Sequence, residues 1–183
     1  MSPSLQKDAN AVVVIVGSGG RESALAWKLS QSPNVRRILL VPGNGYTASF
    51  CSQKISNGFL DLDNLSLDNP SYFNQFSDRC KTEKVALVVI GPEAPLAAGL
   101  ADHLLREGIA CFGPQTQAAK LEWDKVYAKS FFDKYGIPTA RWKSFTKSDE
   151  AVKYINRYMI VPDPNFLVTY SPSTCNVMCT VKL

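Results

Sequence analysis

The chain has 183 residues, of which 45% are hydrophobic and 10% aromatic, and its 20 Lys and Arg against 16 Asp and Glu give a formal net charge of +4 at pH 7. This composition is typical of a folded globular protein and excludes collagen-like, coiled-coil and mostly disordered chains. The length suffices for one full hydrophobic core and part of a second, so two complete domains are not expected.

Three features of the sequence predict a cytoplasmic protein. The longest apolar runs, Ala11–Val16 and Val85–Ile90, are far shorter than the roughly 18 residues that span a bilayer, so no membrane partner is expected. Residues 2–10 are too polar for a secretory signal. The five cysteines are odd in number and irregularly spaced, which argues against a disulfide framework and suits a reducing compartment.

Apolar runs that end in glycine or proline alternate with segments whose apolar residues have helical spacing. These patterns predict strands at 12–16, 36–41, 85–90 and 109–112, and helices at 22–31, 72–80 and 95–107. Because strands and helices alternate, we predict an α/β fold, in which an open parallel sheet carries helices on both faces.

A glycine-bearing loop follows each predicted strand. The four loops are Gly17–Arg21, Pro42–Tyr46, Gly91–Pro95 and Gly113–Thr116. In open parallel sheets, ligands bind outside the carboxyl ends of the strands. We therefore expect the four loops to gather at one edge of the sheet and to form a binding site.

The sequence changes character near Thr116. Residues 120–147 hold seven basic and three acidic residues, so the basic excess of the chain is local. The lysines are spread through an amphipathic helix with few aromatic residues between them, which favours a solvated face over a nucleic-acid interface. A strand at 141–145 and a helix at 149–158 follow.

These patterns divide the chain into four parts. We expect a disordered N-terminus at 1–10, a substrate-binding α/β domain at 11–115, and a linker helix with the start of a second, truncated domain at 116–156. Residues 157–183 contain three prolines, which break any periodic pattern, so a disordered tail is expected there.

The loop from Gly17 to Glu22 lies between a predicted strand and a predicted helix. Its backbone N–H groups and the helix dipole favour an anion such as phosphate, and Arg21 offers a bidentate contact to it. Glu22 stands in place of the third glycine of the dinucleotide motif, and no acidic residue follows the second strand, so NAD is disfavoured. The alternative, in which the glycines serve only a tight turn and close packing, stays open.

Three further residues have two interpretations each. The Glu93 carboxylate lies in a proline-stiffened loop, where it either accepts hydrogen bonds from an amine or sugar hydroxyl or stabilises a helix start. The Asn44 amide either faces a ligand or supplies the conformation of its turn. Lys125 either belongs to the solvated face or contacts a nucleotide phosphate.

The sequence predicts no catalytic side chain and no metal site. His103, the only histidine, falls on the leucine-rich helix away from the glycine loops, so a Ser-His or Cys-His mechanism has no support. Cys175 and Cys179 have no histidine near them and no second pair, which disfavours a metal site.

Five ordered motifs within residues 11–156 together resemble one enzyme family. They are Val14–Glu22, Pro42–Asn44, Gly91–Leu100, Phe112–Pro114 and Gly136–Ala140. The chain resembles the glycinamide ribonucleotide synthetases (phosphoribosylamine–glycine ligases), which belong to the ATP-grasp ligases and in animals form the first module of a trifunctional purine-synthesis protein. The resemblance implies that ATP, with Mg²⁺, phosphorylates the carboxylate of glycine, and that the amine of 5-phosphoribosylamine then displaces the phosphate to give glycinamide ribonucleotide.

The resemblance also implies roles for individual residues. It assigns phosphoribosylamine binding to Gly17, Gly19, Gly20, Arg21, Glu22, Asn44 and Glu93, and ATP binding to Lys125. The chain departs from the family at Ser23, where histidine is usual, and at Gly45-Tyr46, where Ala-Gly is usual.

The family continues into an ATP lid and metal-binding Glu and Asn residues that this sequence lacks. We therefore expect the substrate-binding N-terminal part of a ligase, inactive alone. The alternatives are a non-catalytic phosphoribosyl-binding module or short regulatory isoform and, on the glycine loop alone, a dinucleotide-dependent oxidoreductase.

Overall fold

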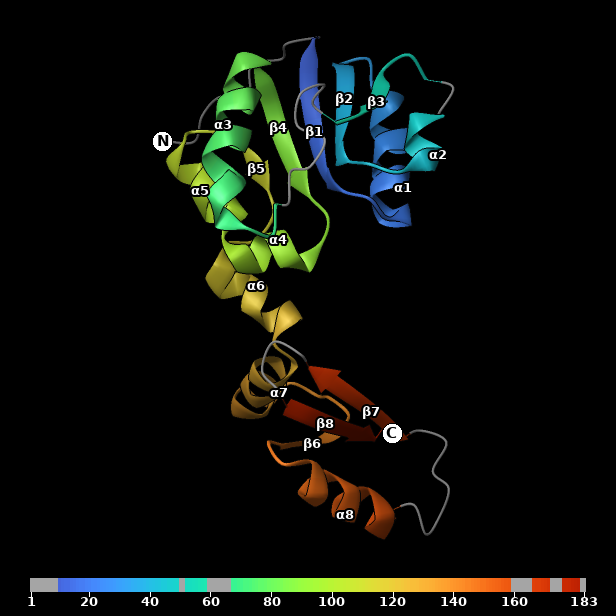
Figure 1. The fold of residues 1–183 in the computed structure, drawn as a ribbon, viewed down its shortest axis with the longest axis vertical. Coiled ribbons are helices and arrows are strands. Elements are labelled where there is room, and N and C mark those ends of the chain that lie inside the picture. The colour runs from blue at the N-terminus through green and yellow to red at the C-terminus, as the bar shows by residue number, and fades with distance from the viewer. Residues whose placement is uncertain (1–9, 50–51, 59–66, 159–165, 172–175, 182–183) are drawn as a thin grey trace. The chain divides into compact units, whose positions relative to one another are not determined.

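The structure is a computed structural model that describes residues 10–49, 52–58, 67–158, 166–171 and 176–181 (Figure 1). The chain divides into two compact units, residues 1–119 and 120–183, and each is described by itself. Residues 1–9 of the predicted disordered N-terminus lie outside the described residues.

The first unit is built on a five-stranded parallel sheet in the order β3-β2-β1-β4-β5. Its strands are β1 (Ala11–Gly17), β2 (Val35–Pro42), β3 (Ile55–Asn57), β4 (Val85–Ile90) and β5 (Cys111–Phe112). Its helices are α1 (Gly20–Ser30), α2 (Gly45–Ala48), the 3₁₀ helix η1 (Pro70–Tyr72), α3 (Phe73–Thr82), α4 (Glu93–Ala98) and α5 (Leu100–Arg106). The predicted α/β fold with an open parallel sheet is confirmed.

The central strand β1 is buried on both faces. Val13 and Ile15 pack with Ala26 of α1, and Val12 and Val14, which alternate with them, are at most 2% exposed. Helices α1 and α2 lie beside β2 and β3, whereas α3, α4 and α5 lie beside β4 and β5 (Figure 1). A strand covered on both faces has no polar side of its own, which explains its continuous apolar run.

Several short elements of the first unit differ from the sequence prediction. The helix expected at 95–107 is divided into α4 and α5 by Gly99, whose φ of 95° lies in the left-handed region that glycine adopts readily. Strand β3 and helix α2 have three and four residues, too few for a periodic signal. The strand expected at 109–112 is only Cys111–Phe112.

The second unit combines helices with a small antiparallel sheet in the order β6-β8-β7. Helix α6 (Thr116–Trp123) begins in the first unit, which ends at residue 119. The elements that follow it are α7 (Lys125–Lys134), β6 (Arg141–Phe145), α8 (Ser148–Tyr158), β7 (Phe166–Ser171) and β8 (Asn176–Val181). The Asp124 carboxylate caps α7 by accepting a hydrogen bond from the Tyr127 N–H at 2.9 Å.

Two described segments of the predicted tail form strands, whereas the expected domain boundaries stay a prediction. Strands β7 and β8 lie within residues 157–183, and α8 ends at Tyr158, as the predicted helix at 149–158 does. Pro162, Pro164 and Pro172 lie outside the described residues. Each strand is rich in β-branched and aromatic residues, and pairing with β8 or β6 supplies backbone partners that local periodicity does not reveal.

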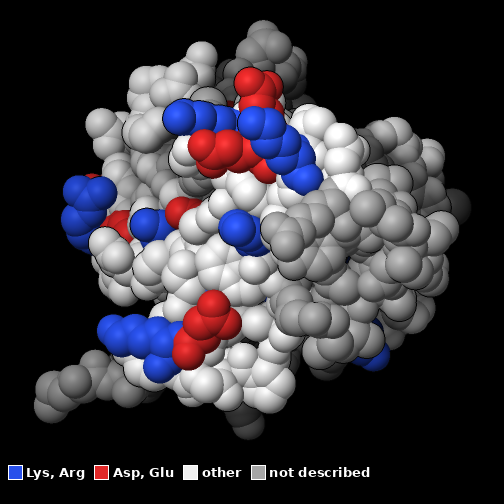
Figure 2. Space-filling model, turned by 90° about the horizontal axis from the view of Figure 1, so that it is seen from below, with Lys and Arg blue, Asp and Glu red and all other residues white. Residues whose placement is uncertain are grey.

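Two lysines of the second unit lie near carboxylates. Lys120 lies 3.8 Å from the Asp124 carboxylate, and Lys147 lies 3.8 Å from that of Glu150. On the face drawn in Figure 2, Lys and Arg side chains lie next to Asp and Glu side chains. This arrangement favours the solvated-face interpretation. Among the residues that the structure describes, no helix combines the length and apolar character needed to cross a membrane.

Asp102 joins α5 to the start of α6. Its carboxylate accepts hydrogen bonds from the Thr116 hydroxyl at 2.6 Å and the Thr116 N–H at 2.8 Å. These two hydrogen bonds hold the pKa of Asp102 below its ordinary value, and the bond from the Thr116 hydroxyl has the larger effect.

We predict that Asp102→Asn lowers the free energy of unfolding at pH 7 by about 1.5 kcal/mol, because it weakens two hydrogen bonds to a charged group. Since the folded-state pKa is depressed, this stabilisation is complete above the unfolded-state pKa and is lost as the pH falls through the folded-state pKa. Urea denaturation should therefore show a difference at pH 7 that shrinks at about pH 3.

The matched control is Asp78→Asn, an exposed carboxylate on α3, which should change the unfolding free energy by less than about 0.5 kcal/mol. Equal stability of the Asp102→Asn variant and the wild type at pH 7 would contradict the prediction.

Candidate functional site

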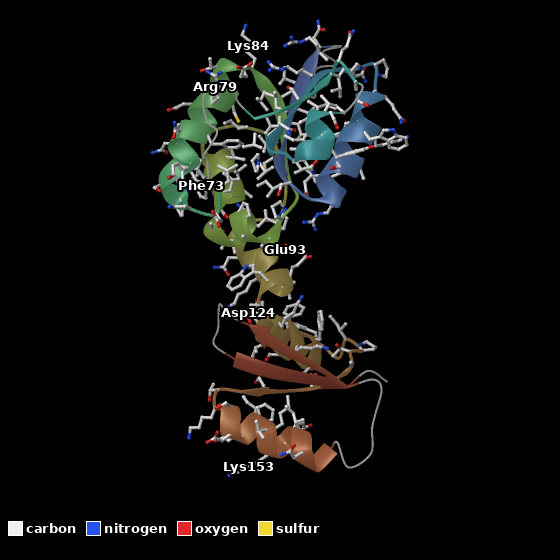
Figure 3. The ribbon with its side chains drawn as sticks, turned by 45° about the vertical axis from the view of Figure 1, so that its right-hand side comes forward. Phe73, Arg79, Lys84, Glu93, Asp124 and Lys153 are labelled. Carbon is white, nitrogen blue, oxygen red and sulfur yellow. The ribbon has the colours of Figure 1, made fainter. Side chains whose placement is uncertain are left out.

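The loops that follow β1, β2 and β4 meet at one end of the first unit. The Gly43 N–H donates to the Gly17 carbonyl at 3.1 Å, and the Gly91 N–H donates to the Val16 carbonyl at 3.1 Å. Glu93, at the start of α4, lies at this end (Figure 3). Three of the four predicted loops are therefore brought together at the carboxyl ends of their strands.

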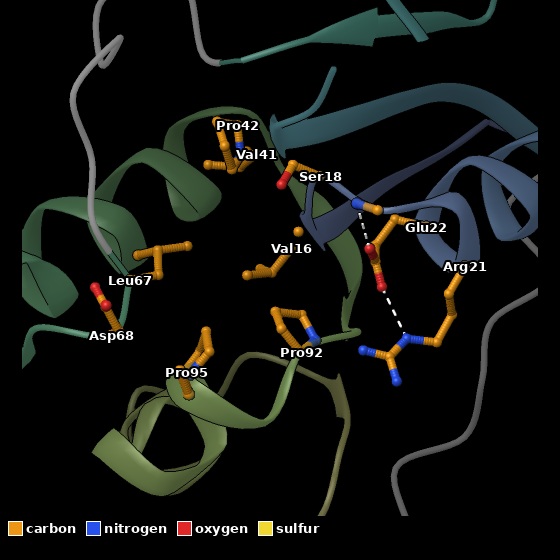
Figure 4. A pocket seen from close by; sticks show the side chains of 13 residues that line it. Val16, Ser18, Arg21, Glu22, Val41, Pro42, Leu67, Asp68, Pro92 and Pro95 are labelled. Atoms are coloured by element: carbon orange, nitrogen blue, oxygen red, sulfur yellow. Dashed lines mark hydrogen bonds and ion pairs between the residues drawn. The ribbon is translucent and has the colours of Figure 1, made fainter. Parts of the chain in front are cut away.

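A pocket of about 470 Å³ opens between these loops (Figure 4). Its lining residues are Val16, Gly17, Ser18, Gly19, Arg21, Glu22, Val41, Pro42, Leu67, Asp68, Pro92, Ala94 and Pro95. Arg21 and Glu22 lie on one side of the pocket, and Leu67 and Asp68 lie on the other (Figure 4). The fourth predicted loop, Gly113–Thr116, does not contribute to the lining.

The structure divides the predicted substrate residues between three places. The pocket is lined by Gly17, Gly19, Arg21 and Glu22. Gly20 and Asn44 instead line a second pocket of about 740 Å³, together with Trp27 and Tyr46. Glu93 is not a lining residue of either, but its carboxylate lies 3.6 Å from Nη1 of Arg21.

The Glu22 side chain is turned into the loop, with only 4% of it exposed. Oε2 accepts a hydrogen bond from the Gly19 N–H at 2.7 Å, and Oε1 accepts one from Nε of Arg21 at 2.9 Å. As the third residue of α1, Glu22 reaches back to the residue before the helix, which is half of a capping box. The buried carboxylate is thus fully engaged, as burial of a charge requires.

Glycines leave the space that the Glu22 side chain occupies. A Cβ built on Gly17 would lie 2.7 Å from Cγ of Glu22, and one on Gly19 would lie 2.8 Å from Oε2. A Cβ on Gly91 would collide with Oε1, whereas one on Gly20 would meet nothing within 4 Å. Close packing against Glu22 therefore requires glycine at three positions, and Gly20 is not one of them.

Arg21 carries the cation of the pocket. Among the lining residues it is the single basic one, and its side chain is 53% exposed. The hydrogen bond to Glu22 raises the pKa of the guanidinium above its ordinary value, with smaller contributions from Glu93. The cation thus lies beside the carboxylates of Glu22 and Glu93, and the Asp68 carboxylate lies on the opposite side of the pocket.

Asn44 ties two loops together. Its Oδ1 accepts a hydrogen bond from the Thr47 N–H at 2.9 Å and so caps α2. Its Nδ2 donates to the Ser18 carbonyl at 2.8 Å and to the Ser23 hydroxyl at 3.0 Å. The side chain therefore sets its own turn and holds the β2–α2 loop against the β1–α1 loop, while Ser23 lies buried at this junction.

Lys125 belongs to the second unit, where it is the first residue of α7 and its Nζ donates to the Glu122 carbonyl at 3.0 Å. Its ATP-binding role stays a prediction. The described residues include no group of three or more His, Cys, Asp or Glu side chains able to hold a metal, and Cys175 lies outside them.

The sequence interpretation missed the wall of the pocket formed by Leu67 and Asp68. Both precede η1 in a segment without helical or strand periodicity, where Asp-Asn-Pro indicates only a turn. Their place opposite Glu22 depends on how the chain returns from β3 to the other side of β1, and no local pattern encodes that return.

Comparison with known proteins gives a consistent result. Residues 11–122 match the family described as "Phosphoribosylglycinamide synthetase, N domain". The chain is 51% identical over 145 residues to the trifunctional purine biosynthetic protein adenosine-3 of Homo sapiens, which covers 79% of this chain and 13% of that protein. It is 44% identical over 147 residues to the phosphoribosylamine–glycine ligase of Ralstonia nicotianae, and this match covers 79% of this chain and 32% of that protein. The chain therefore spans about a third or less of the length of these relatives.

Solved structures share the fold at low identity. The phosphoribosylamine–glycine ligase of Thermotoga maritima has a TM-score of 0.56 at 22% identity, covering 94% of this chain and 44% of that one. The N5-carboxyaminoimidazole synthetase of Staphylococcus aureus has a TM-score of 0.57 at 14% identity, and the match covers 95% of this chain and 47% of that one. At these identities the likeness supports the fold alone.

We predict that Gly91→Ala destabilises the protein by about 2 kcal/mol, because overpacking of a filled site typically costs 1–3 kcal/mol and the new methyl group would meet the Glu22 carboxylate. Urea denaturation measures the effect.

Gly20→Ala is the control, because its methyl group would point into open space at the first residue of α1. It should leave stability unchanged or raise it by up to about 1 kcal/mol. Equal effects of the two substitutions would show that Glu22 does not fill the space beside Gly91.

Proposed function

The chain belongs to the phosphoribosylglycinamide synthetase family through its N domain, and we propose that its first unit binds 5-phosphoribosylamine in the pocket at the carboxyl ends of β1, β2 and β4. The observation that carries this proposal is the exposed guanidinium of Arg21 at the edge of a pocket of about 470 Å³. That volume lies within the range of small-molecule sites, roughly 300–1,000 Å³.

The charges of the pocket suit the two ends of this substrate. A guanidinium presents paired N–H donors that match a phosphate. Carboxylates accept hydrogen bonds from sugar hydroxyls or an amine, and Glu93 and Asp68 supply them. Val41 and Pro42 at the end of β2 offer no carboxylate for the ribose of a dinucleotide, which disfavours an oxidoreductase.

In the complete protein, the proposed reaction is that of an ATP-dependent carbon–nitrogen ligase. A phosphoryl group passes from ATP to the carboxylate of glycine, and the amine of 5-phosphoribosylamine then displaces phosphate to form glycinamide ribonucleotide. The role of this chain's pocket is to bind and orient the amine, since such chemistry depends on positioning and charge stabilisation. Lys125 is the proposed contact to ATP, and bound Mg²⁺ would screen its phosphates.

The remaining proposals concern the setting of this activity. Glycine, ATP and 5-phosphoribosylamine are the proposed small-molecule partners, with no nucleic acid and no membrane among them. A cytoplasmic location is proposed because Cys80 and Cys111, the cysteines with described side chains, are both free thiols, as a reducing compartment favours.

A second candidate function is a non-catalytic phosphoribosyl-binding module. This candidate concerns the 183 residues taken by themselves, which span 13% and 32% of the length of the two relatives. We expect the 183 residues to bind ligand without glycine-dependent ADP release, measured in a coupled assay with phosphoribosylamine generated in place. Turnover comparable with that of a full-length ligase would contradict this expectation and favour a self-sufficient enzyme.

The binding site itself is tested with ribose 5-phosphate, a stable compound that lacks the amine. Arg21→Ala should raise its Kd by about tenfold or more in titration calorimetry, because the phosphate loses a charge-assisted hydrogen bond. Ribose without phosphate should bind weakly to both proteins.

Lys28→Ala is the matched control, since Lys28 lies on the same helix but outside the pocket lining. It should leave the Kd unchanged. The assignment fails if Arg21→Ala binds ribose 5-phosphate as tightly as the wild type does.

A further inference from the structure

We propose that Glu22 is a positioning residue: its carboxylate is a built-in anion that fills the space at the start of α1 and aims Arg21 at the pocket, without touching the ligand. The role toward a ligand rests on the proposed function of the pocket. The role within the loop does not.

Both oxygens of Glu22 are already engaged. One accepts the Gly19 N–H at 2.7 Å and the other accepts Nε of Arg21 at 2.9 Å, while the side chain is 4% exposed. A negative charge at a helix N-terminus is favoured by the helix dipole. A ligand phosphate that approached the Gly19 N–H would have to displace a bonded carboxylate, so that donor serves the protein itself.

The surroundings of Glu22 go beyond those of an ordinary capping box. Gly17 and Gly19 leave room for it from the β1–α1 loop, and Gly91 does so from the β4–α4 loop. In a dinucleotide-binding loop, glycines at this turn let a pyrophosphate approach the helix N-terminus. Here the Glu22 carboxylate takes that place, and it packs against two of the three loops of the pocket.

Arg21 needs this partner to point as it does. Neighbouring residues on a helix do not normally face each other, so the bond between Arg21 and Glu22 is not a consequence of helix geometry alone. It uses Nε and leaves the two terminal nitrogens free of Glu22, with Nη1 at 3.6 Å from the Glu93 carboxylate. A long side chain held in this way loses less rotamer freedom when a ligand binds.

Chemical rescue tests the built-in anion. Glu22→Ala should lower Tm, and sodium formate should restore part of that loss relative to sodium chloride at the same ionic strength, because formate can occupy the vacated site. The control is Glu107→Ala, which removes an exposed carboxylate that pairs with Lys81. The proposal is overturned if formate stabilises Glu22→Ala no more than the control.

A second variant, Glu22→Gln, tests the proposal if Glu22→Ala does not fold. Glu22→Gln keeps the shape of the side chain but presents a neutral amide to Arg21. In ¹⁵N-resolved spectra, the Nε–H of Arg21 should exchange slowly with water in the wild type and rapidly in Glu22→Gln. Equal exchange in the two proteins would overturn the proposal, and neither this readout nor formate rescue requires any phosphoribosyl ligand.

Ligand binding tests the positioning role. Glu22→Gln should raise the Kd for ribose 5-phosphate by about tenfold. Adding Arg21→Ala to the Glu22→Gln variant should raise the Kd little further, because each change alone already removes the contact between a correctly placed Arg21 and the phosphate. Additive effects would indicate that Glu22 contacts the ligand directly, which overturns the proposal. If the wild type does not bind ribose 5-phosphate, the proposed function fails, whereas rescue and exchange still decide the role of Glu22.

Discussion

The position of β1 between β2 and β4 is the constraint on which the pocket depends. The chain leaves β1 toward α1 and β2 on one side, whereas it leaves β4 toward α4 and β5 on the other. Loops that diverge in this way leave a crevice at the carboxyl ends of the strands. In the parallel pairing of β1 with β2, Gly17 lies opposite Pro42, and both residues line the pocket.

Much of this arrangement could be predicted from local sequence. A strand covered on both faces is recognised by an unbroken apolar run such as Val12–Val16, and the glycines after it mark the turn into α1. Strand β3 could not be predicted, since its three residues derive their strand character from pairing with β2. The same holds for β7 and β8. Strand β8 pairs with β6, which is distant in sequence, and with β7, which has no recognisable strand pattern either.

The sequence predicts where the candidate site lies, at the carboxyl ends of the strands, but not which residues contact one another there. Residue chemistry alone left two roles open for Asn44, and only the structure shows its amide bonded to the Ser18 carbonyl and the Ser23 hydroxyl. Glu22 illustrates the same limit. Its position in the loop is visible in the sequence, but its inward direction follows from the space beside Gly91, a residue of another strand's loop.

The two carboxylates beside Arg21 differ in how firmly they are held. Glu22 is buried and forms two short hydrogen bonds, whereas the Glu93 side chain is 46% exposed and lies 3.6 Å from Nη1. An exposed ion pair at such a distance contributes little to stability, about 0–1 kcal/mol. In the proposed function, an incoming phosphate therefore exchanges with Glu93 rather than with Glu22. The exchange gives the phosphate the outer edge of Arg21, and it releases the Glu93 carboxylate to accept hydrogen bonds from the ribose hydroxyls or the amine of the same ligand.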